Sequence, residues 1–115
     1  MSEGRIQDEI RLALSKEGYC LWRNNIAKAE IRGRWVAFGV GGPGGADLIG
    51  LHEGRFLAIE VKTPIGKQTE EQRLFEQLVI ARGGEYVVLR SAAQAVAWAR
   101  QRSEQRRISA PAVPL

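Results

Sequence analysis

The chain has 115 residues, of which 44% are hydrophobic and 26% are charged, and its net charge is +4. This length fits one domain with a single core. No apolar run approaches the ~18–20 residues that span a bilayer, and the N-terminus lacks the apolar segment of a secretory signal. A lone cysteine and a lone histidine exclude an intrachain disulfide, a cysteine-based zinc site and a histidine-rich metal site. We therefore expect an intracellular protein whose basic surplus permits a nucleic-acid partner, with a merely solubilising basic surface as the alternative.

A helix and two strands are predicted for the first part of the chain. Residues 4–17 carry apolar side chains at helical spacing, and Gly18 is a plausible end of that helix. Residues 19–29 and 34–38 are predicted as strands joined by a turn near Arg32-Gly33.

Three side chains on these two strands are expected to be covered. Cys20 is predicted as a small buried residue. Trp22 and Trp35 are expected to pack in the core or at a dimer seam, in preference to stacking on bases.

The glycine loop over residues 39–45 contains a GxGxxG pattern, but a predicted strand follows it where a nucleotide site needs a helix. We therefore expect no nucleotide cofactor.

The next segment predicts a β-hairpin with acidic residues in opposition. If Glu53-Gly54 is a two-residue turn, Asp47 lies directly across from Glu60. Like charges so placed are destabilising, and Lys62 shares their side of the hairpin because strand side chains alternate. Such carboxylates suit a hard divalent cation such as Mg²⁺ or Mn²⁺. The alternative is an exposed ladder in which Lys62 bridges the two acids.

The second half predicts a helix, a strand and a further helix. Thr69 and Gln72 fit a capping box at the start of the first of these helices. The strand covers residues 85–90, Ser91 caps the last helix through about residue 102, and residues 103–115 are expected to form a flexible basic tail. The predicted order is α-β-β-β-β-α-β-α, an α/β domain over residues 1–102. Its mixed sheet would be flanked by helices and include one parallel crossover.

At this point the chain resembles a known family. Gly45-Ala46-Asp47, then Ile59-Glu60-Val61-Lys62, then Gln72 in the next helix, is similar to the PD-(D/E)xK nuclease superfamily, and within it to the VRR-NUC (virus-type replication-repair nuclease) group. The resemblance runs from the first helix to about residue 90. Ala46 stands where the superfamily pattern has proline, a departure that the superfamily tolerates.

The resemblance implies a restriction-endonuclease-like core, αβββαβ in outline, and a DNase dependent on Mg²⁺ or Mn²⁺. It implies metal binding by Asp47, Glu60 and the Val61 carbonyl, catalysis by Lys62, and a site role for Gln72. It also implies an extra glutamate ligand from the first helix. Stand-alone members of this kind, from bacteria and phages, are associated with homodimers and with cutting branched DNA such as Holliday junctions.

Helical periodicity favours Glu9 as the extra metal ligand, because it lies about 60° from the centre of the apolar stripe, at 100° per residue. Glu3 and Glu17 also fall near that face, at the helix ends. The alternative for Glu9 is a solvated helix carboxylate, and the alternative for Gln72 is its capping role alone.

Basic residues flank the predicted site and could contact DNA phosphates, or could simply be solvated. The leading prediction is therefore a homodimeric endonuclease acting on structured DNA. The alternatives are a nuclease of the same fold with another DNA specificity and a non-catalytic DNA-binding module. The predicted phosphate contacts are Arg23, Lys28, Arg32, Arg34 and Lys67.

Overall fold

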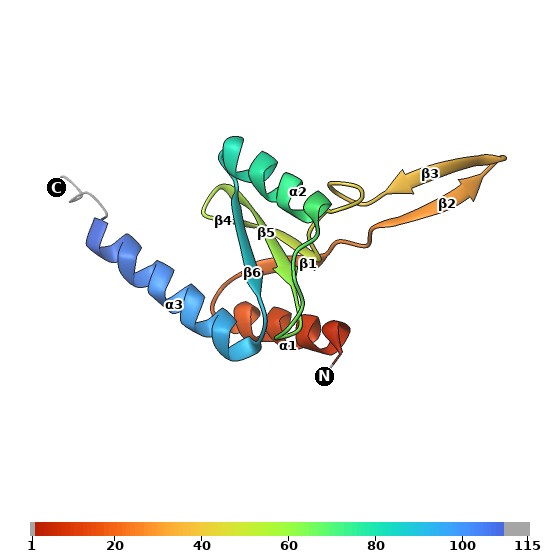
Figure 1. Cartoon of the computed structure of the whole chain (residues 1–115). Coiled ribbons are helices and arrows are strands. Elements are labelled where there is room, and N and C mark those ends of the chain that lie inside the picture. The colour runs from red at the N-terminus through yellow and green to blue at the C-terminus, as the bar shows by residue number, and fades with distance from the viewer. Residues whose placement is uncertain (1, 110–115) are drawn as a thin grey trace.

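The computed structural model describes residues 2–109, and the side chains of residues 2–106, as an α/β fold with a mixed sheet flanked by helices (Figure 1). In chain order the elements are α1 (Glu3–Lys16), β1 (Cys20–Arg23), β2 (Ala27–Ile31), β3 (Arg34–Phe38), β4 (Leu48–His52), β5 (Arg55–Val61), α2 (Glu70–Ala81), β6 (Glu85–Leu89) and α3 (Ala92–Ser109). No helix within residues 2–109 is both long enough and apolar enough to cross a membrane.

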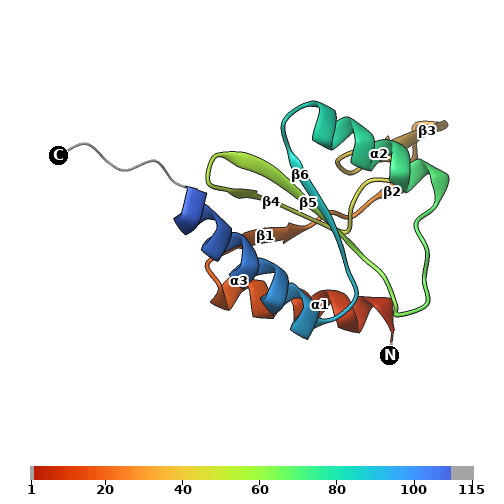
Figure 2. The same cartoon turned by 60° about the vertical axis from the view of Figure 1, so that its left-hand side comes forward.

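The main sheet has four strands in the order β1-β4-β5-β6, and helices cover both of its faces (Figure 2). Its pairs are antiparallel except for β5 and β6, which are parallel and joined through α2, so the predicted crossover is confirmed. On one face, buried side chains of α1 and α3 pack against the sheet. On the other face, Phe75 and Val79 of α2 pack on Ala46 and Ala58.

The predicted register of the β4–β5 hairpin is confirmed. His52 pairs with Arg55, and each earlier pair sums to the same index down to Leu48 with Ile59. Glu53 and Gly54 both have positive φ, 52° and 79°. This conformation belongs to the type I′ turn, whose twist matches that of the two strands and whose second position favours glycine.

The predicted strand over residues 19–29 is in fact two strands in different sheets. β1 pairs with β4, whereas β2 pairs only with β3, and the turn at Arg32-Gly33 joins β2 to β3 as predicted. The break falls at Asn24, whose side chain bonds the backbone of Val40 and Ala46 instead of continuing a strand. The order is therefore α-β-β-β-β-β-α-β-α, with one strand more than predicted.

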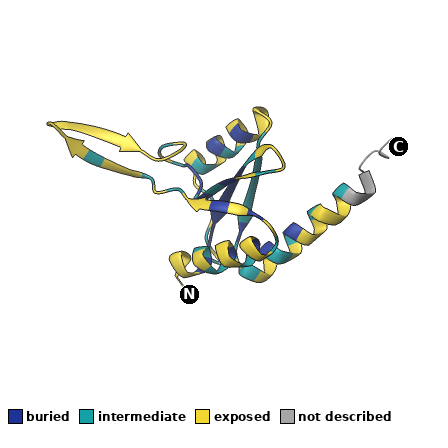
Figure 3. Ribbon diagram, turned by 180° about the vertical axis from the view of Figure 1, so that it is seen from behind, coloured by how far each residue is buried: buried dark blue, intermediate teal, exposed yellow. Residues whose placement is uncertain are grey.

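The β2–β3 hairpin projects from the main sheet as an arm, and almost all of it is exposed (Figure 3). The arm and α3 extend toward opposite sides of the molecule (Figure 1), whose long axis is 62 Å, against 33 and 24 Å for the other two. Trp35 lies on this arm and is 72% exposed, and Trp22 on β1 is 49% exposed. Cys20 is exposed as well. The predictions of core packing for the tryptophans and of burial for Cys20 are therefore wrong, since these strands lack a covering layer on this side.

Local signals placed the helices well, with one exception. Thr69 and Gln72 form the predicted capping box, and the Ser91 hydroxyl accepts a hydrogen bond from the Gln94 N–H. α3 does not end near residue 102 but continues to Ser109, so residues 103–109 of the expected flexible tail are helical. Residues 110–115 of that tail lie outside the described residues.

Candidate metal centre

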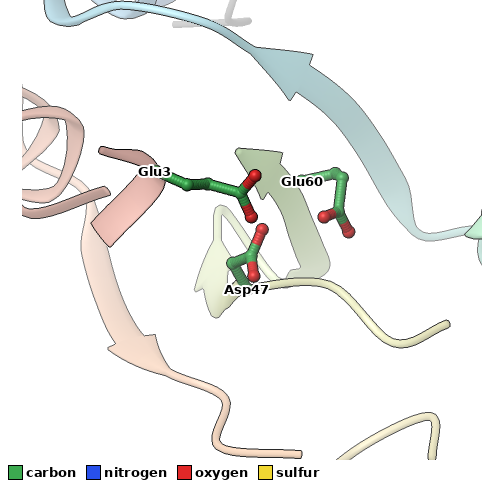
Figure 4. A group of neighbouring side chains, drawn as sticks. All are labelled: Glu3, Asp47 and Glu60. Carbon is green, nitrogen blue, oxygen red and sulfur yellow. The ribbon is translucent and has the colours of Figure 1, made fainter. Parts of the chain in front are cut away.

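Three carboxylates from separate parts of the chain converge at one end of the main sheet (Figure 4). Glu3 is the first residue of α1, Asp47 directly precedes β4, and Glu60 lies in β5. One oxygen from each carboxylate lies within 4.8 Å of the other two. Carboxylate oxygens gathered from three elements are the ligand type that Mg²⁺ and Mn²⁺ prefer.

The backbone fixes Asp47 beside Glu60. Asp47 lies one residue beyond the last ladder pair, where the hairpin register places it opposite Glu60. The Val61 N–H donates to Asp47 Oδ2 over 2.8 Å, and the Asn24 N–H donates to the Asp47 carbonyl, also over 2.8 Å. The prediction that Asp47 and Glu60 lie in opposition therefore agrees with the structure, and Val61 holds Asp47 through its N–H. The Val61 carbonyl as a metal ligand stays a prediction.

Glu60 is 1% exposed, and its two oxygens have different surroundings. Oε1 accepts a hydrogen bond from Gln72 Nε2 over 3.1 Å and lies 4.0 Å from Lys62 Nζ. Oε2 is buried and has no hydrogen-bond partner within the described part of the chain. A buried polar atom without a partner costs free energy and calls for an explanation. For the charged form of Glu60, a cation bound between the carboxylates would supply the missing interaction, so the residues present fit a divalent metal.

The protein alone disfavours the charged form of Glu60. Burial raises the pKa of Glu60 to about 9, and the Asp47 carboxylate, which a protonated Glu60 can hydrogen bond, adds to the increase. Lys62 opposes the increase in this pKa, and Glu3 adds to it. The cluster therefore repels its own negative charge, which a bound cation would neutralise.

Lys62 is 8% exposed and lies directly beside the carboxylates. Its backbone N–H donates to the Leu89 carbonyl over 3.1 Å, which fixes the end of β5 against the end of β6. Lysine is almost never buried without a charged partner, and here that partner is Glu60. The alternative of an exposed Asp–Glu–Lys ladder does not fit the burial of Glu60 and Lys62.

Gln72 combines the two roles that the sequence left open. Its Oε1 accepts from the Thr69 N–H over 2.9 Å, and its own N–H donates to the Thr69 hydroxyl over 3.2 Å. The remaining amide nitrogen donates to Glu60. One side chain thus caps α2 and orients a carboxylate of the cluster.

The helix-one member of the cluster is Glu3, and Glu9 is not part of it. Glu9 lies on α1 and pairs with Arg5 over 3.3 Å, as a partly solvated helix carboxylate does. Glu3 lies three residues before Ile6, in line with the buried stripe, and could have been recognised from that spacing. The prediction began the helix one residue too late, whereas Ser2 caps it and puts Glu3 in the first turn.

The five predicted phosphate contacts do not form one cluster. Arg23 donates to Gln7 over 3.0 Å and lies 3.6 Å from Asp8, so it fastens β1 to α1. Lys67 is exposed in the connection between β5 and α2. The other three, Lys28, Arg32 and Arg34, lie on the arm that projects away from the sheet (Figure 1).

Comparison with protein families and with curated proteins yields no match. No family model matches the chain, and no curated protein sequence matches it. The resemblance to the VRR-NUC group therefore depends on the motif residues quoted above.

Proposed function

We propose that this protein is a divalent-metal-dependent endonuclease that hydrolyses phosphodiester bonds in structured, branched DNA. The observation that carries the proposal is the convergence of Glu3, Asp47 and Glu60 next to the buried Lys62. The order of elements supports it. Without the β2–β3 arm, α1, β1, β4, β5, α2 and β6 follow the αβββαβ outline of a restriction-endonuclease-like core.

The chain's own groups have separate roles in this proposal. Glu3, Asp47 and Glu60 would hold Mg²⁺ or Mn²⁺, with the Val61 carbonyl as the remaining predicted ligand. The bound cation would neutralise charge on the scissile phosphate and acidify a water molecule. Lys62 directs its ammonium group toward the same corner, where it can stabilise the charge that develops on the phosphate. Gln72 would keep the Glu60 carboxylate in a fixed orientation.

DNA as the substrate is supported by the motif resemblance and by the charge of the chain. The net charge is +4, and Lys28, Arg32 and Lys67 are exposed on the arm and on the connection before α2. Cations on a projecting arm can reach phosphates some distance from the scissile bond, which suits a branched substrate. Such contacts make binding weaker as the salt concentration rises.

The test is cleavage of end-labelled four-way junction, flap and linear duplex DNA with Mg²⁺ or Mn²⁺. We expect the wild type to cut the junction and Lys62→Met to be slower by about 10²–10³-fold, since it removes one preorganised charge. Methionine keeps the apolar volume of the buried stem, and a thermal melt verifies that the variant folds. Lys16→Met, on the exposed end of α1, is the matched control and should cut like the wild type.

Each outcome distinguishes the alternatives. If the protein binds DNA but cleaves it with neither metal, the enzyme hypothesis is wrong and the protein is a DNA-binding module. If it cleaves linear duplex at one sequence alone, it is a nuclease without specificity for branched DNA. Equal cleavage by the wild type and Lys62→Met would contradict the role given to Lys62.

A further inference from the structure

The β2–β3 arm exposes apolar side chains on both of its faces. Directly paired residues of β2 and β3 share a face, and side chains alternate along each strand. One face carries Ile31, Val36 and Phe38, the other carries Trp35, and all four side chains are exposed. An isolated two-stranded hairpin is marginally stable at best in water. A ligand that contacts both faces would therefore stabilise the arm more than one that covers a single face.

Trp35 lies close to the tip of the arm. It pairs with Glu30, and one further pair separates it from the turn at Arg32-Gly33. Its side chain is 72% exposed. A tryptophan ring presents a large, flat apolar surface whose preferred contacts include other rings. Bases of nucleic acids stack on such side chains, with little dependence on sequence.

Three unpaired cations lie along the arm. Lys28, Arg32 and Arg34 are exposed, and together with the single acid Glu30 they give residues 27–38 a net charge of +2. None of the three lies within salt-bridge distance of a carboxylate in the described part of the chain. Arg32 also has a φ of 52°, a conformation that favours asparagine or glycine. The turn itself therefore gives no reason for an arginine, whereas an anionic ligand at the tip does.

An exposed ring among unpaired cations is the combination that binds nucleic acid. Bases stack on the ring while the cations contact phosphates. A purely apolar protein surface fits less well, because it would cover the cations without pairing them, which is costly. Charge and shape at the tip therefore favour DNA as the occupant.

The arm begins beside the acidic cluster. The Asn24 N–H donates to the Asp47 carbonyl, and the Asn24 side chain fixes the base of the arm through the backbone of Val40. The chain from Asn24 to Glu30, which pairs with Trp35, spans at most about 20 Å at about 3.4 Å per residue. This span equals about six base pairs, since the duplex also rises about 3.4 Å for each one. Trp35 can therefore reach a base within about six base pairs of a phosphate at the cluster.

We propose that the arm recognises the branch point of a DNA substrate. Trp35 stacks on a base exposed at the branch, and Arg32 and Arg34 contact the phosphates that converge there. The proposal rests on the proposed function, from which it takes branched DNA as the substrate. The duplex segments that diverge from a branch lie on both sides of an inserted hairpin, which matches the exposure of both faces of the arm.

Stacking at the branch would give selectivity over continuous duplex. In a continuous duplex the ring must separate two stacked base pairs, which costs free energy. At a branch point the stack is already interrupted, so this cost is smaller. Loss of one contact between a base and an aromatic ring corresponds to about 5–150-fold in affinity. We therefore expect Trp35 to raise the affinity for branched DNA and to leave that for duplex nearly unchanged.

The test is binding of the full chain to a labelled four-way junction in EDTA, with unlabelled junction or closed-circular duplex as competitor. The circular duplex has no ends and therefore no exposed base. We expect the wild type to prefer the junction and Trp35→Leu to bind it at least about tenfold more weakly, with unchanged affinity for duplex. Trp35→Phe keeps a ring and should retain most of the preference. Trp22→Leu, at an exposed tryptophan of β1, is the matched control and should bind like the wild type.

The two arginines are tested by the salt dependence of junction binding. Arg32→Asn suits the positive φ of the turn, and Arg34→Gln removes the other charge. Each variant should reduce the slope of log affinity against log salt concentration by about 0.9, the value for one lost phosphate contact. Arg11→Gln, exposed on α1, is the matched control and should leave the slope unchanged. Thermal melts verify that every variant folds.

The outcomes separate this proposal from the nuclease activity. Equal affinity of the wild type and Trp35→Leu for the junction would overturn the proposal, whether or not the protein cuts DNA. A wild type that does not prefer the junction, or that binds no DNA, would overturn it too. Trp35→Phe as weak as Trp35→Leu would exclude stacking, and unchanged salt slopes for both arginine variants would exclude their phosphate contacts. A preference that depends on Trp35, in a protein that cuts DNA with neither metal, would support the arm and contradict only the nuclease.

Discussion

The acidic cluster and the β2–β3 arm break the usual distribution of residues in opposite ways. At the cluster, Glu60 and Lys62 are buried, although charged groups belong in water. On the arm, Ile31, Val36 and Phe38 are exposed, although such side chains are usually covered. At the cluster, three carboxylates face the single ammonium group of Lys62, and this excess of negative charge is the reason for proposing a metal there. On the arm, the apolar side chains meet solvent within the described residues.

The two regions are physically joined, although they differ in chemistry. The backbone N–H of Asn24 holds the Asp47 carbonyl, and the Asn24 side chain holds the base of the arm. Fixing the arm would therefore also stiffen the segment that presents Asp47. The difference between the two regions can be tested at the cluster, and the following predictions run from the largest expected effect to the smallest.

Replacing Asp47 should have the largest effect. Asp47→Asn removes the charge of a proposed metal ligand and weakens the acceptor of the Val61 N–H. We expect cleavage of four-way junction DNA to fall by about 10³-fold, in the range found when a preorganised charge is lost from an active site. Single-turnover cleavage measures this rate. A variant with near wild-type cleavage would mean that the cluster is not the active site.

The two helix-one carboxylates give a matched comparison. Glu3→Gln should weaken Mn²⁺ binding by about 10–100-fold, because Glu3 belongs to the cluster. Glu9→Gln should leave binding unchanged, because Glu9 pairs with Arg5 instead. Calorimetric titration with Mn²⁺ measures both. The reverse ranking would restore Glu9 as the ligand that periodicity favoured.

The pH dependence of stability should report the buried charge of Glu60. Its folded-state pKa, about 9, is above the ordinary value of 4.5, so the folded protein binds more protons between these pH values. The contribution of Glu60 to the free energy of unfolding is therefore fully present below about pH 4.5 and is lost as the pH rises toward 9. In EDTA, we expect the melting temperature to fall by several degrees over this range, and Glu60→Gln to remove most of that slope.

Divalent metal should act in the opposite sense on the same melting curves. Metal binding needs the charged form of Glu60, so Mn²⁺ should raise the melting temperature more at high pH than at low pH. A melting temperature that does not change with pH in EDTA, for the wild type, would contradict the burial of an uncompensated carboxylate.

The sequence by itself determined the features that depend on a few neighbouring residues. The Glu53-Gly54 turn fixed the hairpin register, and with it the opposition of Asp47 to Glu60, because a type I′ turn allows one pairing of the strands that follow it. The capping box of Thr69 and Gln72 placed the start of α2 for the same reason, since its hydrogen bonds lie within one helical turn.

Only the tertiary structure decided the features that depend on distant contacts. Residues 19–29 have strand character throughout, but the pairing of β1 with β4, and the bonds from Asn24 to Val40 and Ala46, divide them between two sheets. The choice of Glu3 over Glu9 followed from where α1 docks against the sheet, which periodicity does not specify. The exposure of Trp22 and Trp35 has the same origin, because composition shows that a side chain is apolar but only packing determines whether anything in the chain covers it.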